Sequence, residues 1–263
     1  MAALILLAAL VCGPLAADSG STPGAPTYSA DSIANSAAGV AGLYAPNTFI
    51  SIYGQNLAHT IRAIAPGDIT AGTLPTALTG TGVRVLINQI PADIWYVSPT
   101  LINVLIPTLL IAGPATLQIE VDGLAGPAAA IVLGNTAPAL FQPDATTVLA
   151  VHLDGSLITP ASPARAGEVI VLFATGLGVT QPAQIPNQLA PGAAEIAGRA
   201  DFQILLNGAS VDPSQILYAG AAPGFAGLYQ INLRMPASIP NNPEIRLNTT
   251  ERISPPGRFL PAQ

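Results

Sequence analysis

Residues 49–58 read FISIYGQNLA and residues 169–178 read VIVLFATGLG, so one apolar run that ends in a glycine turn occurs twice. Two further pairs follow in the same order: VLIN at 85–88 with ILLN at 204–207, and INVLIP at 102–107 with INLRMP at 231–236. Self-similarity at a nearly constant offset indicates a duplicated unit. The offset widens only before the third pair, where the second copy has a longer loop, GAAPGFAG at 220–227.

Each copy consists of short runs rich in Val, Ile, Leu, Tyr and Phe, separated by turn signals such as APNT, NQIP and PNNP. The chain has 25 glycines and 26 prolines, which break long helices and suit short strands joined by turns. Between the copies, VLAVHLDGSLIT at 148–159 alternates on both sides of Asp154 and Gly155, a strong hairpin signal. The sequence therefore predicts an all-β protein, a tandem of two immunoglobulin-like β-sandwich domains.

The two copies also set the expected limits of the domains. The first domain is predicted over residues 28–140 and the second over residues 141–255. Residues 18–27, DSGSTPGAPT, have the composition of a flexible lead-in. Residues 256–263 are expected to form an extended tail.

Charged residues are scarce in this chain. They make up 8% of it, all eight basic residues are arginine, and the net charge is −6. Because no basic stripe is present to neutralise phosphates, we expect no nucleic-acid partner. A surface built from small and uncharged polar residues suits a secreted, periplasmic or cell-surface protein.

The N-terminal residues have the pattern of a secretory signal peptide, residues 1–17. The apolar run from Leu4 to Val11 precedes small residues that predict cleavage near Ala17. No Lys or Arg precedes the run, so a truncated start and an ordinary buried N-terminal segment stay open as alternatives. Cys12 is the only cysteine and would leave with the signal, with a lipid anchor on it as a further alternative. No stretch reaches the roughly 18 uninterrupted apolar residues of a transmembrane span.

Several blocks of the sequence resemble one known family. They include APNTFISIYGQNLA, TGVRVLINQIPADIWYVSPTLINVLIP, DGSLITPASPARAGEVIVLFATGLG and YAGAAPGFAGLYQINLRMP. Together they resemble the uncharacterised C-terminal domain family of exported proteins from Solibacter and other Acidobacteria, over roughly residues 30–250. The resemblance implies export and no defined activity. Each copy also looks like an IPT/TIG-type immunoglobulin-like module, an analogy of fold that implies no ligand.

The motifs of common active sites are absent from the sequence. No G-x-S-x-G pentapeptide occurs, and His59 and His152 lie in different copies without an H-E-x-x-H motif or a Cys/His cluster. The glycine-rich segments at 79–84 and 176–181 lack the third glycine of a dinucleotide-binding motif. We therefore expect no catalytic residue, no metal site and no cofactor, and we interpret both histidines as exposed residues.

The repeat predicts which face of the strand at 101–107 is buried. Alternate residues that are apolar in both copies should face the two cores: Ile102, Val104, Ile106, Ile231, Leu233 and Met235. The opposite face holds Leu101, Asn103 and Leu105 in the first copy and Gln230, Asn232 and Arg234 in the second. Leu101 and Leu105 would each forgo about 1.5 to 3 kcal/mol of burial in water, so something should cover them.

The cover of this face stays open at this point: the second domain, the segment SIANSAAGVAGLY at 32–44, or an external protein or glycan. In ADIWYV, alternation places Asp93 and Trp95 on one face, which the aspartate marks as the outer one. There Trp95 would stack on a sugar or pack at the domain junction. Phe225 and Tyr229 flank the longer loop of the second copy and are further candidates for a recognition surface.

The interface candidates are therefore Trp95, Leu101, Leu105, Phe225 and Tyr229. The sequence favours a secreted or cell-surface protein that is not an enzyme, with a binding, adhesion or structural role and an envelope protein or glycan as partner. The alternative is a polysaccharide-active enzyme or a carbohydrate-binding accessory module. The enzyme would need two carboxylates that converge in one cleft.

Overall fold

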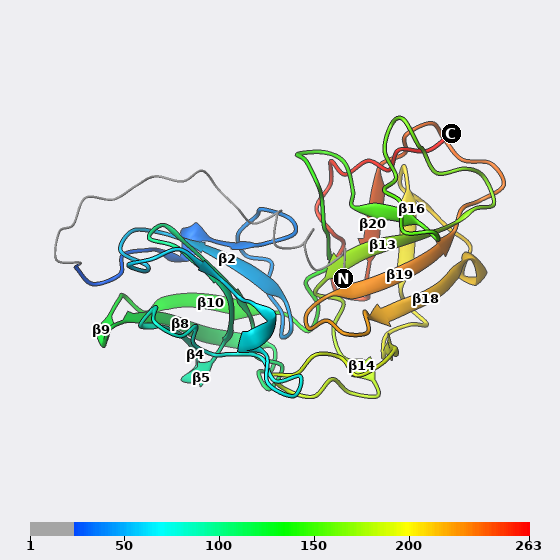
Figure 1. Ribbon diagram of the computed structural model, residues 1–263. Coiled ribbons are helices and arrows are strands. Elements are labelled where there is room, and N and C mark those ends of the chain that lie inside the picture. The colour runs from blue at the N-terminus through cyan, green and yellow to red at the C-terminus, as the bar shows by residue number, and fades with distance from the viewer. Residues whose placement is uncertain (1–23) are drawn as a thin grey trace.

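The structure is a computed structural model that describes residues 24–263. The predicted signal peptide and Cys12 lie outside the described residues. Two β-sandwiches lie side by side (Figure 1). Helical structure in the described part consists of short 3₁₀ turns: Ala30–Ser32 (η1), Pro66–Asp68 (η2) and Pro213–Gln215 (η3). No helix within residues 24–263 has the length and apolar character needed to cross a membrane.

The first sandwich consists of two antiparallel sheets. One has the order β1-β2-β7-β6-β3, with the bounds Ile33–Asn35 (β1), Phe49–Tyr53 (β2), Leu101–Leu105 (β7), Asp93–Val97 (β6) and Arg62–Ala63 (β3). The other has the order β10-β8-β4-β5, with β9 beside β8: Ala129–Leu133 (β10), Gly113–Val121 (β8), Val83–Ile87 (β4), Ile90–Pro91 (β5) and Leu124–Ala125 (β9). The core between the sheets draws on residues from Ile33 to Leu133.

The second sandwich has one large and one small sheet. The large sheet has the order β11-β13-β19-β18-β15-β14, with β12 beside β13: Ala139–Leu140 (β11), Val169–Thr175 (β13), Tyr229–Arg234 (β19), Ile216–Ala221 (β18), Ala194–Ile196 (β15), Thr180–Gln181 (β14) and Ala150–His152 (β12). The small sheet has the order β17-β16-β20: Ala209–Ser210 (β17), Gln203–Leu206 (β16) and Ile245–Asn248 (β20). The core of the second sandwich draws on residues from Leu140 to Ala262.

The strand pairing of the first half recurs in the second. The ladder β2-β7-β6 corresponds to β13-β19-β18, and β5-β4-β8 corresponds to β17-β16-β20. In chain order, β2, β4, β6, β7, β8 and β10 match immunoglobulin strands B to G, because B, E and D share one sheet and C, F and G the other. The predicted tandem of immunoglobulin-like β-sandwiches is confirmed.

Alternation along the two central strands also agrees with the sequence. The residues predicted to face the cores have no solvent exposure: Ile102, Val104, Ile106, Ile231, Leu233 and Met235. The hairpin predicted at 148–159 is present, with Val151 bridged to Leu157. Gly155 makes its turn at a φ of 84°, a conformation that glycine adopts without steric strain.

The C-terminal residues differ from the prediction, because residues 256–263 pack on the second sandwich instead of forming an extended tail. Leu260 and Ala262 are 0% and 1% exposed and belong to the second core. Phe259 bridges to Thr147, and the Ala164 N–H donates to the Pro261 carbonyl at 2.9 Å. The three prolines in SPPGRFLPAQ lack a backbone N–H and interrupt any strand pattern, so the sequence does not predict this packing.

Candidate functional site

A third hydrophobic cluster, which we call the junction cluster, joins the two sandwiches. Its buried members from the first half are Ala37, Ala38, Leu43, Ala45, Phe49, Leu74 and Leu105, and those from the remainder are Ala137, Ala139, Phe141, Leu149, Ala222, Ala226 and Leu228. Two antiparallel backbone contacts reinforce it, because the Leu74 N–H donates to the Asn187 carbonyl at 2.8 Å and the Leu189 N–H to the Gly72 carbonyl at 2.9 Å. The two domains therefore share buried surface.

The longer loop of the second copy covers the apolar face of β7. A Cβ atom placed on Gly227 would lie 2.3 Å from Leu105 Cδ1 and 2.9 Å from Phe49 Cε2. Gly227 also has a φ of 68°, which an L side chain rarely adopts. Leu105 is consequently 2% exposed, whereas Leu101, at the start of β7, is half-buried. The second domain and part of the 32–44 segment, including Leu43, thus contribute to the cover.

Trp95 lies in a bulge of β6, where the register against β7 shifts between Ile94 and Tyr96. The bulge places Ile94 and Val97 in the first core, both with 0% exposure. Trp95 is half-buried beside the junction cluster. Its ring meets Phe49 edge-on, with ring centres 5.2 Å apart. Of the two roles expected from the sequence, the structure places Trp95 at the junction.

Asp93 lies on the predicted face of β6, but the prediction that this face is an outer one is wrong, because it is buried at the junction. Asp93 is opposite Leu105 in the β6–β7 ladder and is 3% exposed. Asp93 precedes the bulge and lies on the face away from the first core, as alternation predicts, but the second domain covers that face beside Leu105. The bulge changes only the residues after it, so that Val97 faces the core although strict alternation would put it on the face of Asp93. Within the described residues its Oδ1 has no hydrogen-bond partner, and burial raises the pKa of Asp93 to about 7. The covering segments 70–75 and 222–228 contain no charged residue, so the carboxyl lacks a counter-ion there.

The two remaining candidates flank the loop as predicted but differ in burial. Phe225 is half-buried and packs on the junction cluster. Tyr229 is 0% exposed in the second core, so the expectation that its ring forms part of an open surface is wrong: it is an inward residue of β19. Burial raises the pKa of Tyr229 to about 12. Tyr229 also lines a cleft, and its hydroxyl donates to the Gly178 carbonyl.

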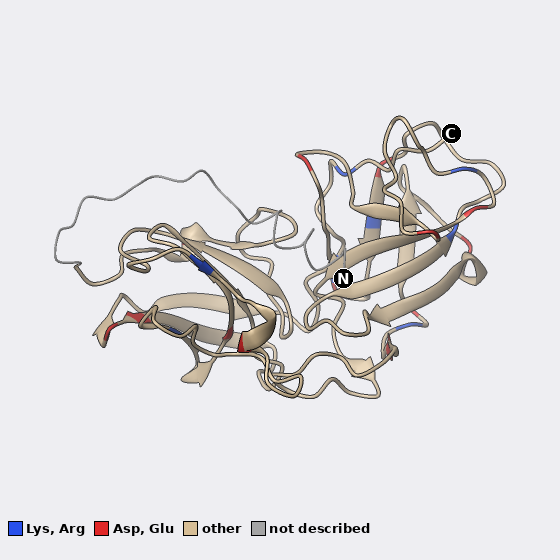
Figure 2. Cartoon of the chain, viewed as in Figure 1, with Lys and Arg blue, Asp and Glu red and all other residues tan. Residues whose placement is uncertain are grey.

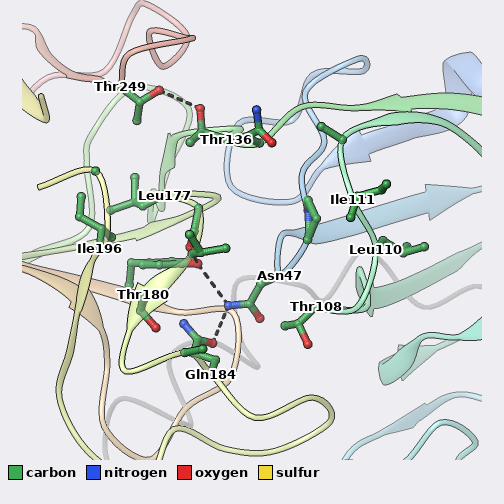
Figure 3. Close-up of a pocket in the computed structure, with 18 of the residues that line it drawn as sticks. Asn47, Thr108, Leu110, Ile111, Thr136, Leu177, Thr180, Gln184, Ile196 and Thr249 are labelled. Atoms are coloured by element: carbon green, nitrogen blue, oxygen red, sulfur yellow. Dashed lines mark hydrogen bonds between the residues drawn. The ribbon is translucent and has the colours of Figure 1, made fainter.

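That cleft has a volume of about 540 Å³ and lies between the two domains (Figure 3). It is lined from the first half mainly by residues 46–47 and 108–112, and from the second mainly by residues 177–180, 183–184 and 249–251. Sites for small ligands are commonly found at domain interfaces and have volumes in this range. We call it the interdomain cleft.

The floor of the interdomain cleft is an uncharged polar network. Asn47, which is 5% exposed, donates through Nδ2 to Gln184 Oε1 at 2.6 Å and to the Tyr229 hydroxyl at 3.3 Å (Figure 3). These bonds leave Asn47 Oδ1 and at least one N–H of the Gln184 amide without a partner among the described residues. The Thr108 Oγ1, on the same wall, is buried and also has no partner there.

The rim of the cleft is apolar and open to solvent. Leu109 and Ile111 on the first domain are 63% and 84% exposed, and Val179 on the second is 74% exposed. Glu251 is the one charged residue among the described lining residues, and Figure 2 shows charged residues scattered thinly over both domains. Exposed aliphatic side chains gathered at one opening are typical of an interaction site.

The sequence does not reveal this cleft, because its walls come from loops without periodicity. Residues 107–112, PTLLIA, follow β7 directly, and GLGVTQ at 176–181 was interpreted as a turn. An apolar run outside any strand was the available signal. APNT at 45–48 was recognised as a turn, and Asn47 has a φ of 62° in it, which asparagine tolerates better than most residues.

The two histidines lie away from the cleft. His59 is exposed, as predicted, and its Nε2 lies 2.8 Å from Asp122 Oδ2. His152 is half-buried, contrary to the prediction, because its ring is held between Glu168 at Nδ1 and Ser162 at Nε2. The bond to Glu168 raises the pKa of His152. Within residues 24–263 no group of three or more His, Cys, Asp or Glu residues is placed to hold a metal ion.

No protein-family model and no curated protein matches the chain. Several solved structures show a weak similarity to this chain, and three of them follow. SGBP-B of the Bacteroides ovatus mixed-linkage glucan utilization locus, in complex with a mixed-linkage heptasaccharide, has 14% identity and a TM-score of 0.30, over 84% of this chain and 40% of that one. The I9–I11 tandem of titin has 9% identity and a TM-score of 0.26, and the match covers 83% of this chain and 61% of that one. The Yersinia pseudotuberculosis adhesin InvE has 12% identity and a TM-score of 0.24, and the match covers 91% of this chain and 59% of that one.

The chain spans less than two thirds of the length of each of these three proteins. Because all three TM-scores are low, the assignment of the immunoglobulin-like fold rests on the strand order of this chain. The resemblance to the Solibacter family stays a prediction.

Proposed function

We propose that this chain is a secreted or cell-surface, non-catalytic binding module whose binding site is the interdomain cleft. The observation that carries the proposal is the exposed aliphatic rim formed by Leu109, Ile111 and Val179, because both domains contribute to it. Each such side chain would gain about 1.5 to 3 kcal/mol if a partner buried it completely.

The junction cluster supports this proposal because it fixes the two walls of the cleft relative to each other. Leu105 and Phe49 of the first domain pack against Gly227 of the second with no space for a methyl group. A site held by packed elements loses little entropy when a partner binds. The sparse charge and the uncharged polar surface are consistent with a location outside the cell.

The experiment compares two matched surface variants of the mature protein. Ile111→Asp places a charge on the rim, and Val132→Asp places one on the exposed edge strand β10, where Val132 is 61% exposed. Biolayer interferometry would measure binding to the solubilised envelope of the producing organism. We expect Ile111→Asp to abolish binding and Val132→Asp to preserve it. Equal binding by both variants would place the site elsewhere.

A further inference from the structure

The floor of the interdomain cleft presents a free acceptor and a free donor side by side. Asn47 Oδ1 accepts no hydrogen bond within the described chain, and the Gln184 amide retains an N–H to donate. The bond between Asn47 Nδ2 and Gln184 Oε1, 2.6 Å long, holds the two amides together. A ligand that satisfies both groups needs one donor and one acceptor close to each other.

A peptide unit has this pairing, because each residue carries one N–H and one carbonyl. From these observations we propose that the interdomain cleft binds an extended, uncharged segment of polypeptide with apolar side chains. Its backbone N–H donates to Asn47 Oδ1 and its carbonyl accepts from Gln184 Nε2, while its side chains pack on the rim. This inference rests on the proposed function and specifies the class of partner.

The walls fit such a segment better than they fit a carbohydrate. Leu110 and Ile111 line the cleft on the side of the first domain and Leu177 on the side of the second (Figure 3). Leu109 and Val179 add to the apolar lining. Sugar recognition commonly uses an aromatic ring as a platform. Tyr229 is the one aromatic residue in the described lining, and its ring is fully buried.

The charge of the lining also favours an uncharged polypeptide segment. Glu251 is the one charged residue of the lining, and its carboxylate accepts from the Asn135 side chain and from the Asn135 N–H at 3.2 Å. The cleft therefore has no cation to pair with an acidic ligand. An uncharged segment enters it without an unpaired buried charge.

The experiment uses a phage-displayed library of random twelve-residue peptides selected on the full chain. Selected peptides are then made synthetically and measured by fluorescence anisotropy, in parallel with an array of neutral oligosaccharides. We expect uncharged peptides rich in aliphatic residues. N-methylation of one central backbone amide should abolish binding, because it removes the donor to Asn47 Oδ1.

Gln184→Glu is the matched variant. A carboxylate can still accept from Asn47 Nδ2 but has no N–H to donate, so binding should weaken roughly tenfold with an unchanged melting temperature. Selected peptides that bind Gln184→Glu as tightly as wild type, or that tolerate N-methylation at every position, would overturn the inference. So would binding of neutral oligosaccharides without peptides, or a rise in particle size with concentration that Ile111→Asp abolishes.

A failure of the proposed binding function would give other results than a failure of the polypeptide inference alone. If neither the peptides nor the oligosaccharides bind, and the envelope material does not distinguish Ile111→Asp from Val132→Asp, the cleft is not a binding site. If the rim variant loses binding while peptides fail, the binding function stands and the polypeptide class is wrong.

Discussion

Replacement of Asp93 by asparagine should stabilise this protein above neutral pH. The carboxyl is 3% exposed, is opposite Leu105 at the junction and has no partner for its Oδ1 in the described chain. An amide of the same shape needs no ionisation. The variant therefore removes the cost of a buried charge while it preserves the packing of the junction cluster.

The sign and size of the effect follow from the pKa of Asp93. Burial raises it to about 7 in the folded protein, and the value in an unfolded chain is about 3.9. The folded state thus binds the proton more tightly, so this contribution to stability is complete below about pH 4 and is lost as the pH rises through about 7. Three pH units correspond to about 4 kcal/mol, an upper limit because local rearrangement can admit water.

The assay is chemical unfolding of wild type and Asp93→Asn between pH 4 and pH 8, monitored by the fluorescence of Trp95. Trp95 is the only tryptophan and lies at the junction, so it reports on this region directly. We expect the variant to be more stable by about 2 to 4 kcal/mol at pH 8, and the difference to shrink toward pH 4. A difference that is constant over the whole range would refute the reasoning, because it would show that Asp93 does not titrate differently in the folded state.

Four further substitutions test the packing. Gly227→Ala should cost about 1 to 3 kcal/mol of stability in thermal or chemical unfolding, from the strained φ and the contact with Leu105; an unchanged melting temperature would show that the loop can move aside. Leu105→Asp should cost at least about 3 kcal/mol and expand the particle in small-angle scattering, whereas Leu101→Asp, at a half-buried position, should cost much less; a double variant that melts and scatters like wild type would contradict the covered face. Leu260→Ala should cost about 2 to 5 kcal/mol, while an effect near zero would restore the extended tail predicted from the sequence.

The sequence predicted those features that depend on a regular period. Along β7 and β19, alternate apolar residues occur in both copies, and all of them are buried as expected. The argument from alternation failed on β6, the strand that precedes β7 in the chain. At Trp95 the bulge inserts a residue, and nothing in ADIWYV distinguishes a bulged strand from a regular one.

The site was harder to predict than the fold, for a physical reason. Asn47 and Gln184 are 137 residues apart in the sequence and meet only across the junction of the two domains. The sequence did indicate that something covers Leu105, but it left the identity of the cover open. Residues 107–112 and 177–180 form opposite walls of one cleft only when the two domains are packed together. The sequence does not show that these two segments meet.

Hydrogen–deuterium exchange of the full chain, with and without a saturating selected peptide, tests most directly whether the interdomain cleft is the binding site. We predict slower exchange in the two walls, residues 108–112 and 177–184, and no change on β4, which contributes no residue to the cleft. Protection confined to the outer face of either sandwich, with unchanged exchange in both walls, would contradict it.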